Sequence, residues 1–367
     1  SATVIRKAAA VIASSGGLDA YPDVDGIVAL AHGSGFGMDV GGLGAQVLER
    51  VLWGYATHPN VGAAVFVGLG CEVMQVARMK QKFDAKGQAR FHGVTIQEAG
   101  GTMGTVAPVV VQVGELLPVV NEAKRSAQPR STLSIALQCG GSDGYSGITA
   151  NPAVGAASDL IVGHGRRVLL AETPEIYGAE QLLLDRVNQT KTGADLVARL
   201  RWWENYTCMR GGSLDNNPTP GNKAGGLTTI LEKSLVAVAK SGATPLNEVV
   251  AYGQKPTEAG LIFMDTPGYD PVSVTGQVAG GAQIVVFTTG RGSAFGSKPA
   301  PTIKLATNDR LFAQMPDDMD INCGDIASAG VSVADKGAQI LDHIVATASG
   351  RATKSEALGL GDNEFVP

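Results

Sequence analysis

The sequence has 367 residues, of which 44% are hydrophobic and 17% charged, and its formal net charge is −5. A chain of this length exceeds the usual size of one hydrophobic core, so we expect two lobes that share a cleft. The 29 basic and 34 acidic residues form no long run of either sign, which argues against a cationic surface for nucleic acid. The apolar runs 26–31 and 63–67 are far shorter than the roughly 20 residues of a membrane span, and the amino terminus has no signal-peptide pattern. We therefore expect a soluble cytoplasmic protein without a nucleic acid or membrane partner.

Cysteine and glycine usage narrows the class of protein further. Four cysteines are widely spaced and include no CxxC pair, which argues against a disulfide framework and against a standard zinc site. The 49 glycines weaken helices and strands, and such a number is tolerated where many tight loops need it. Function is therefore expected in the loops, although a loop-rich α/β enzyme of no particular type has the same composition.

The first third of the chain alternates short apolar runs with segments of helical periodicity, the pattern of a parallel sheet with crossover helices. We predict an α/β fold of two lobes, residues 1–130 and 131–367, the first lobe being a doubly wound, mainly parallel sheet. The predicted strands are 26–31, 63–69, 93–96 and 133–137, and the predicted helices are 47–55 and 106–119.

The second lobe shows the same alternation around a long glycine-rich passage. Residues 211–226 have no clear periodicity and are interpreted as an active-site loop that closes over the cleft. The other predicted elements are a helical stretch over 179–201, strands at 260–264, 283–287 and 302–305, and a closing helix from 333 to about 348.

Chemically reactive side chains follow each of the four predicted strands of the first third. Because the carboxyl ends of parallel strands open into a ligand-binding crevice, we expect His32, Cys71, Gln97 and Cys139 to line one crevice. Taken singly, a cysteine is more often a small buried hydrophobe than a ligand, and His32 is as often a core histidine. The other polar residues of these loops are Glu72, Glu98, Thr102, Ser142 and Asp143.

Later segments add polar residues in similar positions. Thr228 and Thr229 precede a predicted helix, so they either bind a carboxylate at its amino end or only cap it. Arg291 follows a predicted strand and offers a bidentate partner for a carboxylate. The acidic turn 317–320 either holds a hard divalent cation or is an exposed turn.

Eight ordered motifs resemble the altronate dehydratase/galactarate dehydratase family, which also includes the large subunit of sulfolactate sulfo-lyase. The resemblance covers the whole chain and is specific for the family, though not for the substrate. The motifs are GLGCE at 68–72, QCGGSD at 138–143, SGITANP at 146–152, ETPE at 172–175, PGNK at 220–223, EKSL at 232–235, MDTPGYD at 264–270 and FTTGRGS at 287–293.

The resemblance implies dehydration of a 2,3-dihydroxy sugar acid to a 2-keto-3-deoxy acid through a metal-stabilised enediolate, with iron or another divalent ion as cofactor. The candidate metal ligands are His32, Cys71, Glu72 and Cys139. The candidate base is Glu98 or Glu175, and the candidate carboxylate anchors are Lys223, Lys233 and Arg291. Residues expected to contact substrate are Gln97, Thr102, Ser142, Asp143, Asn151, Thr228, Thr229 and Arg291.

The chain is expected to depart from the family pattern in three respects. The first two are the short amino-terminal substrate-capping domain and the Arg/Asp/Gly-rich segment after it, neither of which we identify in the sequence, so we expect a small capping domain or subunit as a partner, and a homo-oligomer. The family segment His-x-x-Gly-Cys-Gly reads HGSGFG at 32–37, so Phe36 stands where a thiol is expected. Metal binding is therefore expected to be weaker or different, unless Phe36 simply packs in the core.

Three other functions are weighed against dehydration. Sulfite elimination from sulfolactate uses the same enediolate, and a non-catalytic sugar-acid binding protein is consistent with Phe36 and the missing segment. A nicotinamide dehydrogenase needs GxGxxG after its first strand, and the glycines at 33, 35 and 37 have the wrong spacing. The sequence does not choose among hydroxy-acid substrates.

Overall fold

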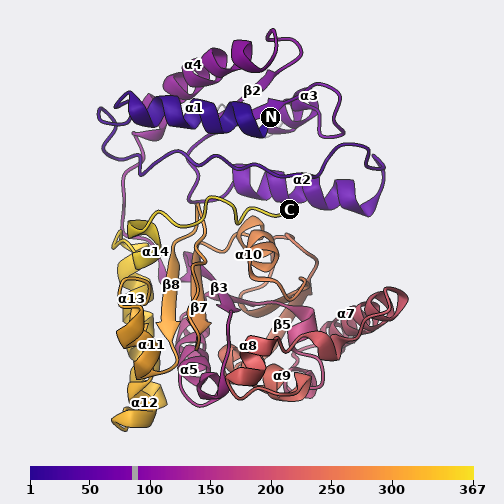
Figure 1. The fold of residues 1–367 in the computed structure, drawn as a ribbon, viewed down its shortest axis with the longest axis vertical. Coiled ribbons are helices and arrows are strands. Elements are labelled where there is room, and N and C mark those ends of the chain that lie inside the picture. The colour runs from indigo at the N-terminus through magenta and orange to yellow at the C-terminus, as the bar shows by residue number, and fades with distance from the viewer. Residues whose placement is uncertain (85–89) are drawn as a thin grey trace. The chain divides into compact units, whose positions relative to one another are not determined.

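A computed structural model describes residues 1–84 and 90–367. The chain divides into two compact units, the first formed by residues 1–127 with 365–367 and the second by residues 128–364 (Figure 1).

The first unit contains a small parallel sheet. Its two strands pair in parallel, with Ala64 beside Phe91 and Gly68 beside Thr95. The predicted strands 63–69 and 93–96 are thus confirmed, whereas the predicted strand 26–31 is wrong, since that run adopts no regular structure. A short apolar run does not by itself find a strand partner, and these residues are only half buried. The elements are α1 (Ala2–Ser14), α2 (Leu43–Ala56), β1 (Ala64–Gly68), α3 (Val76–Asp84), β2 (Phe91–Thr95) and α4 (Thr102–Val120).

Helix α4 packs against α1, and Val4 and Ala8 of α1 share a small core with Val109 of α4. Over the described residues, α4 is the one helix long and apolar enough to cross a membrane; it has 19 residues, and its mean hydropathy is 1.6 in an 18-residue window. A single helix of this kind is weak evidence for a membrane span, because core helices can have the same composition.

The second unit contains a sheet of seven strands in the order β5-β6-β4-β3-β7-β8-β9, and all of its strand pairs are parallel. The α/β class is confirmed, but the large parallel sheet lies in the second unit and not in the first. The strands are β3 (Ser134–Cys139), β4 (Arg167–Leu170), β5 (Leu246–Val250), β6 (Gly260–Met264), β7 (Ile284–Thr289), β8 (Thr302–Ala306) and β9 (Ile321–Asn322).

Helices connect these strands, and short 3-10 turns precede or follow several of them. The helices are α5 (Ala150–Gly163), α6 (Gln181–Leu184), α7 (Thr190–Met209), α8 (Pro220–Ala224), α9 (Ile230–Val238), α10 (Asp270–Ala279), α11 (Asp309–Gln314), α12 (Asp325–Ser328), α13 (Val333–Ala348) and α14 (Lys354–Ala357). The turns are η1 (Arg130–Thr132), η2 (Gly144–Gly147), η3 (Thr173–Glu175), η4 (Leu214–Asn216) and η5 (Ala239–Ser241).

Several predictions for the second unit are confirmed, namely the strands near 133–137, 260–264, 283–287 and 302–305 and the closing helix 333–348. The stretch 179–201 forms two helices, α6 and α7, and not one. The passage 211–226 contains the short helical segments η4 and α8, each capped by a side chain, so it is not a structureless loop. Ser213 and Thr219 are the capping residues, and helix caps are hard to separate from turn signals in sequence.

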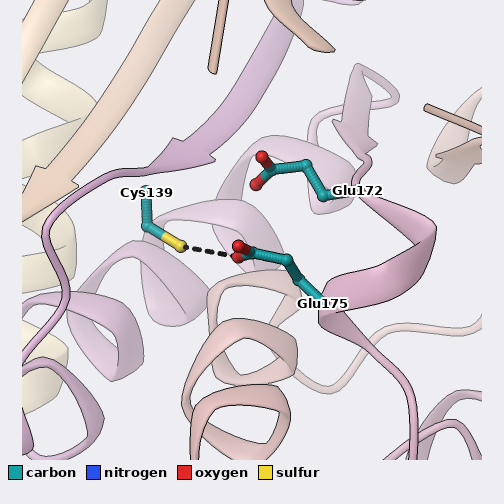
Figure 2. Close-up of side chains that lie close together, drawn as sticks. All are labelled: Cys139, Glu172 and Glu175. Atoms are coloured by element: carbon teal, nitrogen blue, oxygen red, sulfur yellow. Dashed lines mark hydrogen bonds between the residues drawn. The ribbon is translucent and has the colours of Figure 1, made fainter. Parts of the chain in front are cut away.

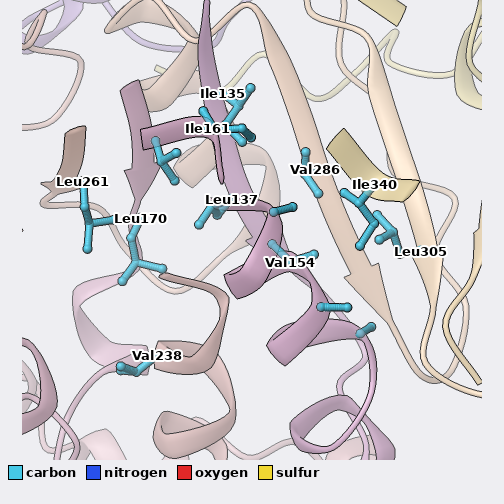
Figure 3. Packing of buried hydrophobic residues seen from close by; sticks show 14 of the residues in the cluster. Ile135, Leu137, Val154, Ile161, Leu170, Val238, Leu261, Val286, Leu305 and Ile340 are labelled. Carbon is cyan, nitrogen blue, oxygen red and sulfur yellow. The ribbon is translucent and has the colours of Figure 1, made fainter. Parts of the chain in front are cut away.

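The core of the second unit lies between the sheet and the helices α5 and α13. Alternate strand residues such as Ile135, Leu137 and Val286 pack against Val154 of α5 and Ile340 of α13 (Figure 3). This alternation is the period-2 pattern of a strand whose faces are covered separately. The sheet therefore provides a rigid support whose carboxyl ends hold the loops described next.

Candidate functional site

Strand β3 ends in Cys139 at the middle of the seven-stranded sheet, between β4 and β7. The chain leaving β3 continues to β4 on one side, whereas the chain leaving β7 continues to β8 on the other. Parallel sheets bind ligands at such a reversal of strand order, outside the carboxyl ends of the strands. The geometry of the sheet therefore points to the loops after β3 and β7.

A cavity of about 420 Å³ opens at the carboxyl end of β3. Its walls come from the loop after β3, the turn η3 after β4, the loop after β6, helices α7 and α9, and the passage 211–226. The lining residues are Cys139, Gly140, Gly141, Ser142, Pro174, Glu175, Trp203, Thr207, Ser213, Leu214, Asn216, Asn217, Thr219, Asn222, Lys233, Gly268, Tyr269 and Asp270. Three of the residues predicted for metal or catalysis, Cys139, Glu175 and Lys233, lie together here.

Glu175 and Lys233 form a buried ion pair in the cavity wall. The Nζ atom of Lys233 lies 2.6 Å from Oε1 of Glu175, and the two side chains are 10% and 5% exposed. The same ammonium group donates a hydrogen bond to Oδ1 of Asn217 at 2.5 Å. The thiol of Cys139 donates to Oε2 of Glu175 at 3.8 Å (Figure 2). One carboxylate oxygen of Glu175 thus pairs with the ammonium of Lys233, and the other accepts a hydrogen bond from the thiol of Cys139.

Glu172 is buried beside this pair in a strained conformation. Its φ of 71° is the only positive φ of a non-glycine residue in the described part of the chain. Both carboxylate oxygens are buried and have no hydrogen-bond partner among the described residues. Burial, and then the negative charge of Glu175, raises the pKa of Glu172 well above its usual value. Strain and an unpartnered buried acid are costly, and they concentrate at functional sites.

A second lysine beside the thiol is more deeply buried than Lys233. Lys240 is 1% exposed, and its Nζ atom lies 2.8 Å from the Cys139 sulfur. Burial raises the pKa of Cys139 to about 11, although the charge of Lys240 works in the opposite direction. Burial, and then the charge of Glu175, also raises the pKa of Asp270 to about 6. The cluster therefore gathers four acidic groups around two ammonium groups.

Gly140 is needed at the cavity floor for a steric reason. A Cβ atom at this position would lie 2.4 Å from Oδ2 of Asp270 and 2.7 Å from the ring of Phe287. Such contacts are well below van der Waals separation, so the absence of a side chain lets the Asp270 carboxylate approach the end of β3.

Cys139, Glu172 and Glu175 could hold a metal ion. Within residues 1–84 and 90–367 they form the only group of three such side chains whose ligand atoms all lie within 4.8 Å of one another. Figure 2 shows the three side chains pointing toward one another. A thiolate with carboxylates suits a borderline divalent ion, and a cation would satisfy the unpartnered oxygens of Glu172. The chemistry of the donor set therefore fits a metal.

The other predicted metal ligands belong to the first unit. Gln97 donates to the sulfur of Cys71 at 3.7 Å, and Glu72 accepts from the backbone N–H of Gly70 at 2.7 Å. His32 contacts Ser34 at 3.2 Å, and burial lowers its pKa. These residues follow β1 and β2 or lie in the preceding loop.

The premise that all four predicted strands share one sheet edge is wrong, because β3 pairs with β4 and β7 and not with β2. Phe36 is 75% exposed, so the alternative that it packs in a core is also wrong. Glu98 and Thr102 of the first unit are exposed.

Several predicted substrate-binding residues of the second unit have structural partners. Asp143 is buried and accepts hydrogen bonds from Ser146, Thr307 and Asn308. Asn151 is also buried, and it donates to the carbonyl of Val236. The contacts of Asp143 tie the loop after β3 to neighbouring segments, and the side chain of Asn222 donates to the carbonyl of Ser142 at 2.8 Å.

For Thr228 and Thr229 the structure shows the capping arrangement. Thr229 caps α9 in a capping box with Glu232, and Thr228 donates to the same carboxylate. Lys223 and Arg291 are exposed and are not among the cavity-lining residues.

The acidic turn at 317–320 was predicted either to hold a divalent cation or to be an exposed turn. One of its carboxylates pairs with a lysine, since Oδ1 of Asp318 lies 3.6 Å from Nζ of Lys304.

Sequence reasoning missed Glu172, Lys240, Asp270 and Trp203. Glu172 and Asp270 lie inside the motifs at 172–175 and 264–270, so proximity to Glu175 in sequence was an available signal for Glu172. Lys240 follows a helix and lies 101 residues from Cys139 in sequence, and no local pattern indicates that contact.

Two family models match the two parts of the chain. Residues 130–367 match the family model described as D-galactarate/Altronate dehydratase, C-terminal. Residues 1–121 match the model described as D-galactarate dehydratase/Altronate hydrolase, second domain.

Among curated proteins, galactarate dehydratase (L-threo-forming) of Escherichia coli is 39% identical over 86% of this chain and 62% of its own length. Altronate dehydratase of Bacillus subtilis is 35% identical over 84% of this chain and 61% of its own length. The chain thus spans about three fifths of these two relatives. The (2R)-sulfolactate sulfo-lyase subunit beta of Chromohalobacter salexigens is 31% identical over 94% of this chain and 87% of its own length. On these matches the chain belongs to the D-galactarate/altronate dehydratase family.

Proposed function

We propose that the protein eliminates water from a 2,3-dihydroxy sugar acid of the galactarate or altronate kind and yields a 2-keto-3-deoxy acid. The observation that carries this proposal is the buried Glu175–Lys233 pair in the wall of the cavity. The names of two relatives, galactarate dehydratase and altronate dehydratase, support the same reaction type.

Each step of the elimination has a residue of suitable chemistry in the cavity. The carboxylate of Glu175 takes the proton from C2, and the electron pair of that C–H bond forms the enediolate. Lys233 binds the substrate carboxylate and balances the charge that develops on it. Asp270 donates a proton to the departing C3 hydroxyl, which leaves as water as the C3–O bond breaks. The resulting enol then becomes the 2-keto-3-deoxy acid.

The proposal includes a divalent ion, with iron as the first candidate because a thiolate belongs to the donor set. Of the three side chains that could hold the ion, we assign Cys139 and Glu172 to it and Glu175 to proton abstraction. When bound, the ion supplies positive charge that stabilises the enediolate. His32, Cys71 and Glu72 remain a second candidate ligand set in the first unit.

The roles of the remaining predicted residues are also proposals. Ser142 lines the cavity and offers a hydroxyl to the substrate. Glu98 and Lys223 are alternatives to Glu175 and Lys233, and both are exposed. We further propose a cytoplasmic homo-oligomer that works with a small capping domain or subunit. The four free cysteines are consistent with a reducing compartment.

The test is a panel of galactarate, altronate and sulfolactate, assayed with no metal and with Fe²⁺, Mn²⁺ or Mg²⁺, with and without a small capping domain. Keto-acid formation from a sugar acid, lost in Glu175→Gln, is the expected result. Binding of sugar acids without any product would instead indicate a non-catalytic binding protein.

A second candidate is sulfite elimination from sulfolactate, in which the leaving group needs no proton. The observation that favours it is the similarity to a sulfo-lyase subunit over 94% of this chain. Release of sulfite without a requirement for Asp270 would identify this reaction in the same panel.

A further inference from the structure

Two residues one turn apart on α7, Trp203 and Thr207, line the same cavity as Glu175 and Lys233. The other walls carry amides and hydroxyls such as Asn216, Asn217 and Ser142. Trp203 adds a large aromatic surface to a lining whose other apolar side chains are Pro174 and Leu214, with a second aromatic ring from Tyr269. Lys233 is the only lysine or arginine among the described residues of that lining, so one anionic group of a ligand finds a cation there.

The indole of Trp203 is held in place by hydrogen bonding. Its Nε1 atom donates to Oδ1 of Asp265 at 2.8 Å. The same oxygen accepts from the hydroxyl of Thr173 at 2.7 Å. Thr173 is fully buried and begins η3, the turn that ends in Glu175. One carboxylate oxygen therefore links the aromatic wall to the turn that carries the proposed base.

Aromatic contacts hold the ring from other sides. Trp202 and Tyr206 both meet Trp203 edge to face, with ring centroids 5.1 and 5.7 Å away and interplanar angles of 83° and 79°. Neither Trp202 nor Tyr206 is a cavity-lining residue. These contacts favour a fixed ring orientation over a freely rotating side chain.

A polyhydroxylated carbon chain has two kinds of surface. Its hydroxyls need hydrogen-bond partners, which the amides and hydroxyls of the cavity supply, and its C–H groups carry slight positive charge. The face of an aromatic ring carries a negative quadrupole and attracts such C–H groups. A ring in a cavity lined by amides therefore matches both surfaces of a sugar acid.

We propose that Trp203, oriented by Asp265, is the surface against which the carbon chain of a sugar acid packs beyond C3, so that this residue selects six-carbon acids over three-carbon acids. This inference rests on the proposed function for the class of ligand. Trp203 acts here as a specificity-determining residue and Asp265 as a positioning residue.

Altronate and glycerate are matched probes, because both are 2,3-dihydroxy acids and they differ in the carbons beyond C3. Dissociation constants are measured by calorimetry for the unaltered protein and for the variants Trp203→Ala, Trp203→Phe and Trp202→Ala, with far-UV circular dichroism to verify folding. We expect Trp203→Ala to weaken altronate binding about tenfold and to leave glycerate binding unchanged. Trp203→Phe keeps the aromatic face but not the bond to Asp265. Its affinity for altronate should lie between the affinities of the unaltered protein and of Trp203→Ala. Trp202→Ala removes one edge-to-face contact but leaves the bond from Trp203 to Asp265, so it should weaken altronate binding less than Trp203→Ala does.

Equal losses for altronate and glycerate in Trp203→Ala, or equal effects of Trp202→Ala and Trp203→Ala, would overturn the inference. Binding of altronate without turnover would overturn the dehydratase function while the chain-length comparison still tests the role of Trp203. If the unaltered protein binds neither acid, both proposals are wrong.

Discussion

The ammonium of Lys233 lies 2.6 Å from the carboxylate of Glu175, and both side chains are almost completely buried. Removing one member leaves an uncompensated buried charge, so Lys233→Met and Glu175→Gln should each lower the free energy of unfolding by about 3 kcal/mol. The double variant Lys233→Met/Glu175→Gln should regain much of that stability, because neither charge of the pair then remains without its partner. Urea unfolding of the three variants measures this.

The same variants should differ in how they affect turnover of a sugar acid and how they affect stability. The double variant should remain at least about a hundredfold below the unaltered protein in kcat for a sugar acid, because it lacks the base. A stable double variant with normal turnover would show that Glu175 is not the base.

The second prediction concerns metal binding at Cys139. The raised pKa keeps this thiol protonated at neutral pH, so an ion that binds there must displace a proton. Affinity for Fe²⁺ or Zn²⁺ should therefore rise about tenfold per pH unit, and Cys139→Ser should weaken it by at least about tenfold. Metal titrations of the unaltered protein and of Cys139→Ser at pH 6, 7 and 8 provide the measurement.

Phe36→Cys and Cys71→Ser are the matched variants for the first unit. If only Cys71→Ser loses affinity for the metal ion, the ion binds in the first unit. A gain of metal affinity in Phe36→Cys would show that position 36 faces the ion. Identical affinities in all these proteins would exclude a thiolate ligand.

The third prediction uses the strain at Glu172. Asparagine tolerates a positive φ and carries no charge, so Glu172→Asn should raise the free energy of unfolding by about 1 to 3 kcal/mol. Glu172→Gln removes the charge but keeps the strain, and should stabilise the protein less. Both variants should bind metal poorly. Unchanged or reduced stability of Glu172→Asn, measured with urea, would show that the carboxylate is already satisfied in solution.

The fourth prediction is a pH dependence of stability due to Asp270. Its pKa is raised from the usual 3.8 to about 6, so the folded state holds this proton more tightly than the unfolded state. The resulting stabilisation is complete below pH 3.8 and is lost as the pH rises through about 6. The unaltered protein should lose on the order of 2 to 3 kcal/mol relative to Asp270→Asn between pH 4 and 7. Parallel unfolding curves of the two proteins across this range would contradict the assignment.

The fifth prediction is that residues 211–226 become more protected when a sugar acid binds. This passage supplies six cavity-lining residues, from Ser213 to Asn222, and a closed wall excludes water from an enediolate. Hydrogen exchange with and without altronate should show slower exchange in this passage and little change in α13. Equal protection in both states would mean that the wall is already rigid.

The sequence by itself determined several of the segments that form regular structure. Branched apolar runs predicted β6 with its observed bounds, and one helical face of apolar residues predicted α13. These signals are local, because side-chain periodicity follows directly from backbone geometry. The sequence also placed Cys139 at the end of a strand, where ligands bind in parallel sheets.

Only the tertiary structure decided which strands and side chains meet. The pattern of β3 is equally suited to pairing with β2, and the partner is set by contacts with β7, about 150 residues away in sequence. Likewise, Lys240 reaches Cys139 across 101 residues, and Asp265 joins Trp203 to Thr173 from three separate segments. Such contacts depend on the packing of whole elements, and the period of a single segment carries no information about its neighbour in the sheet. The positive φ of Glu172 belongs to the same category, since surrounding contacts must impose a conformation that glutamate does not favour.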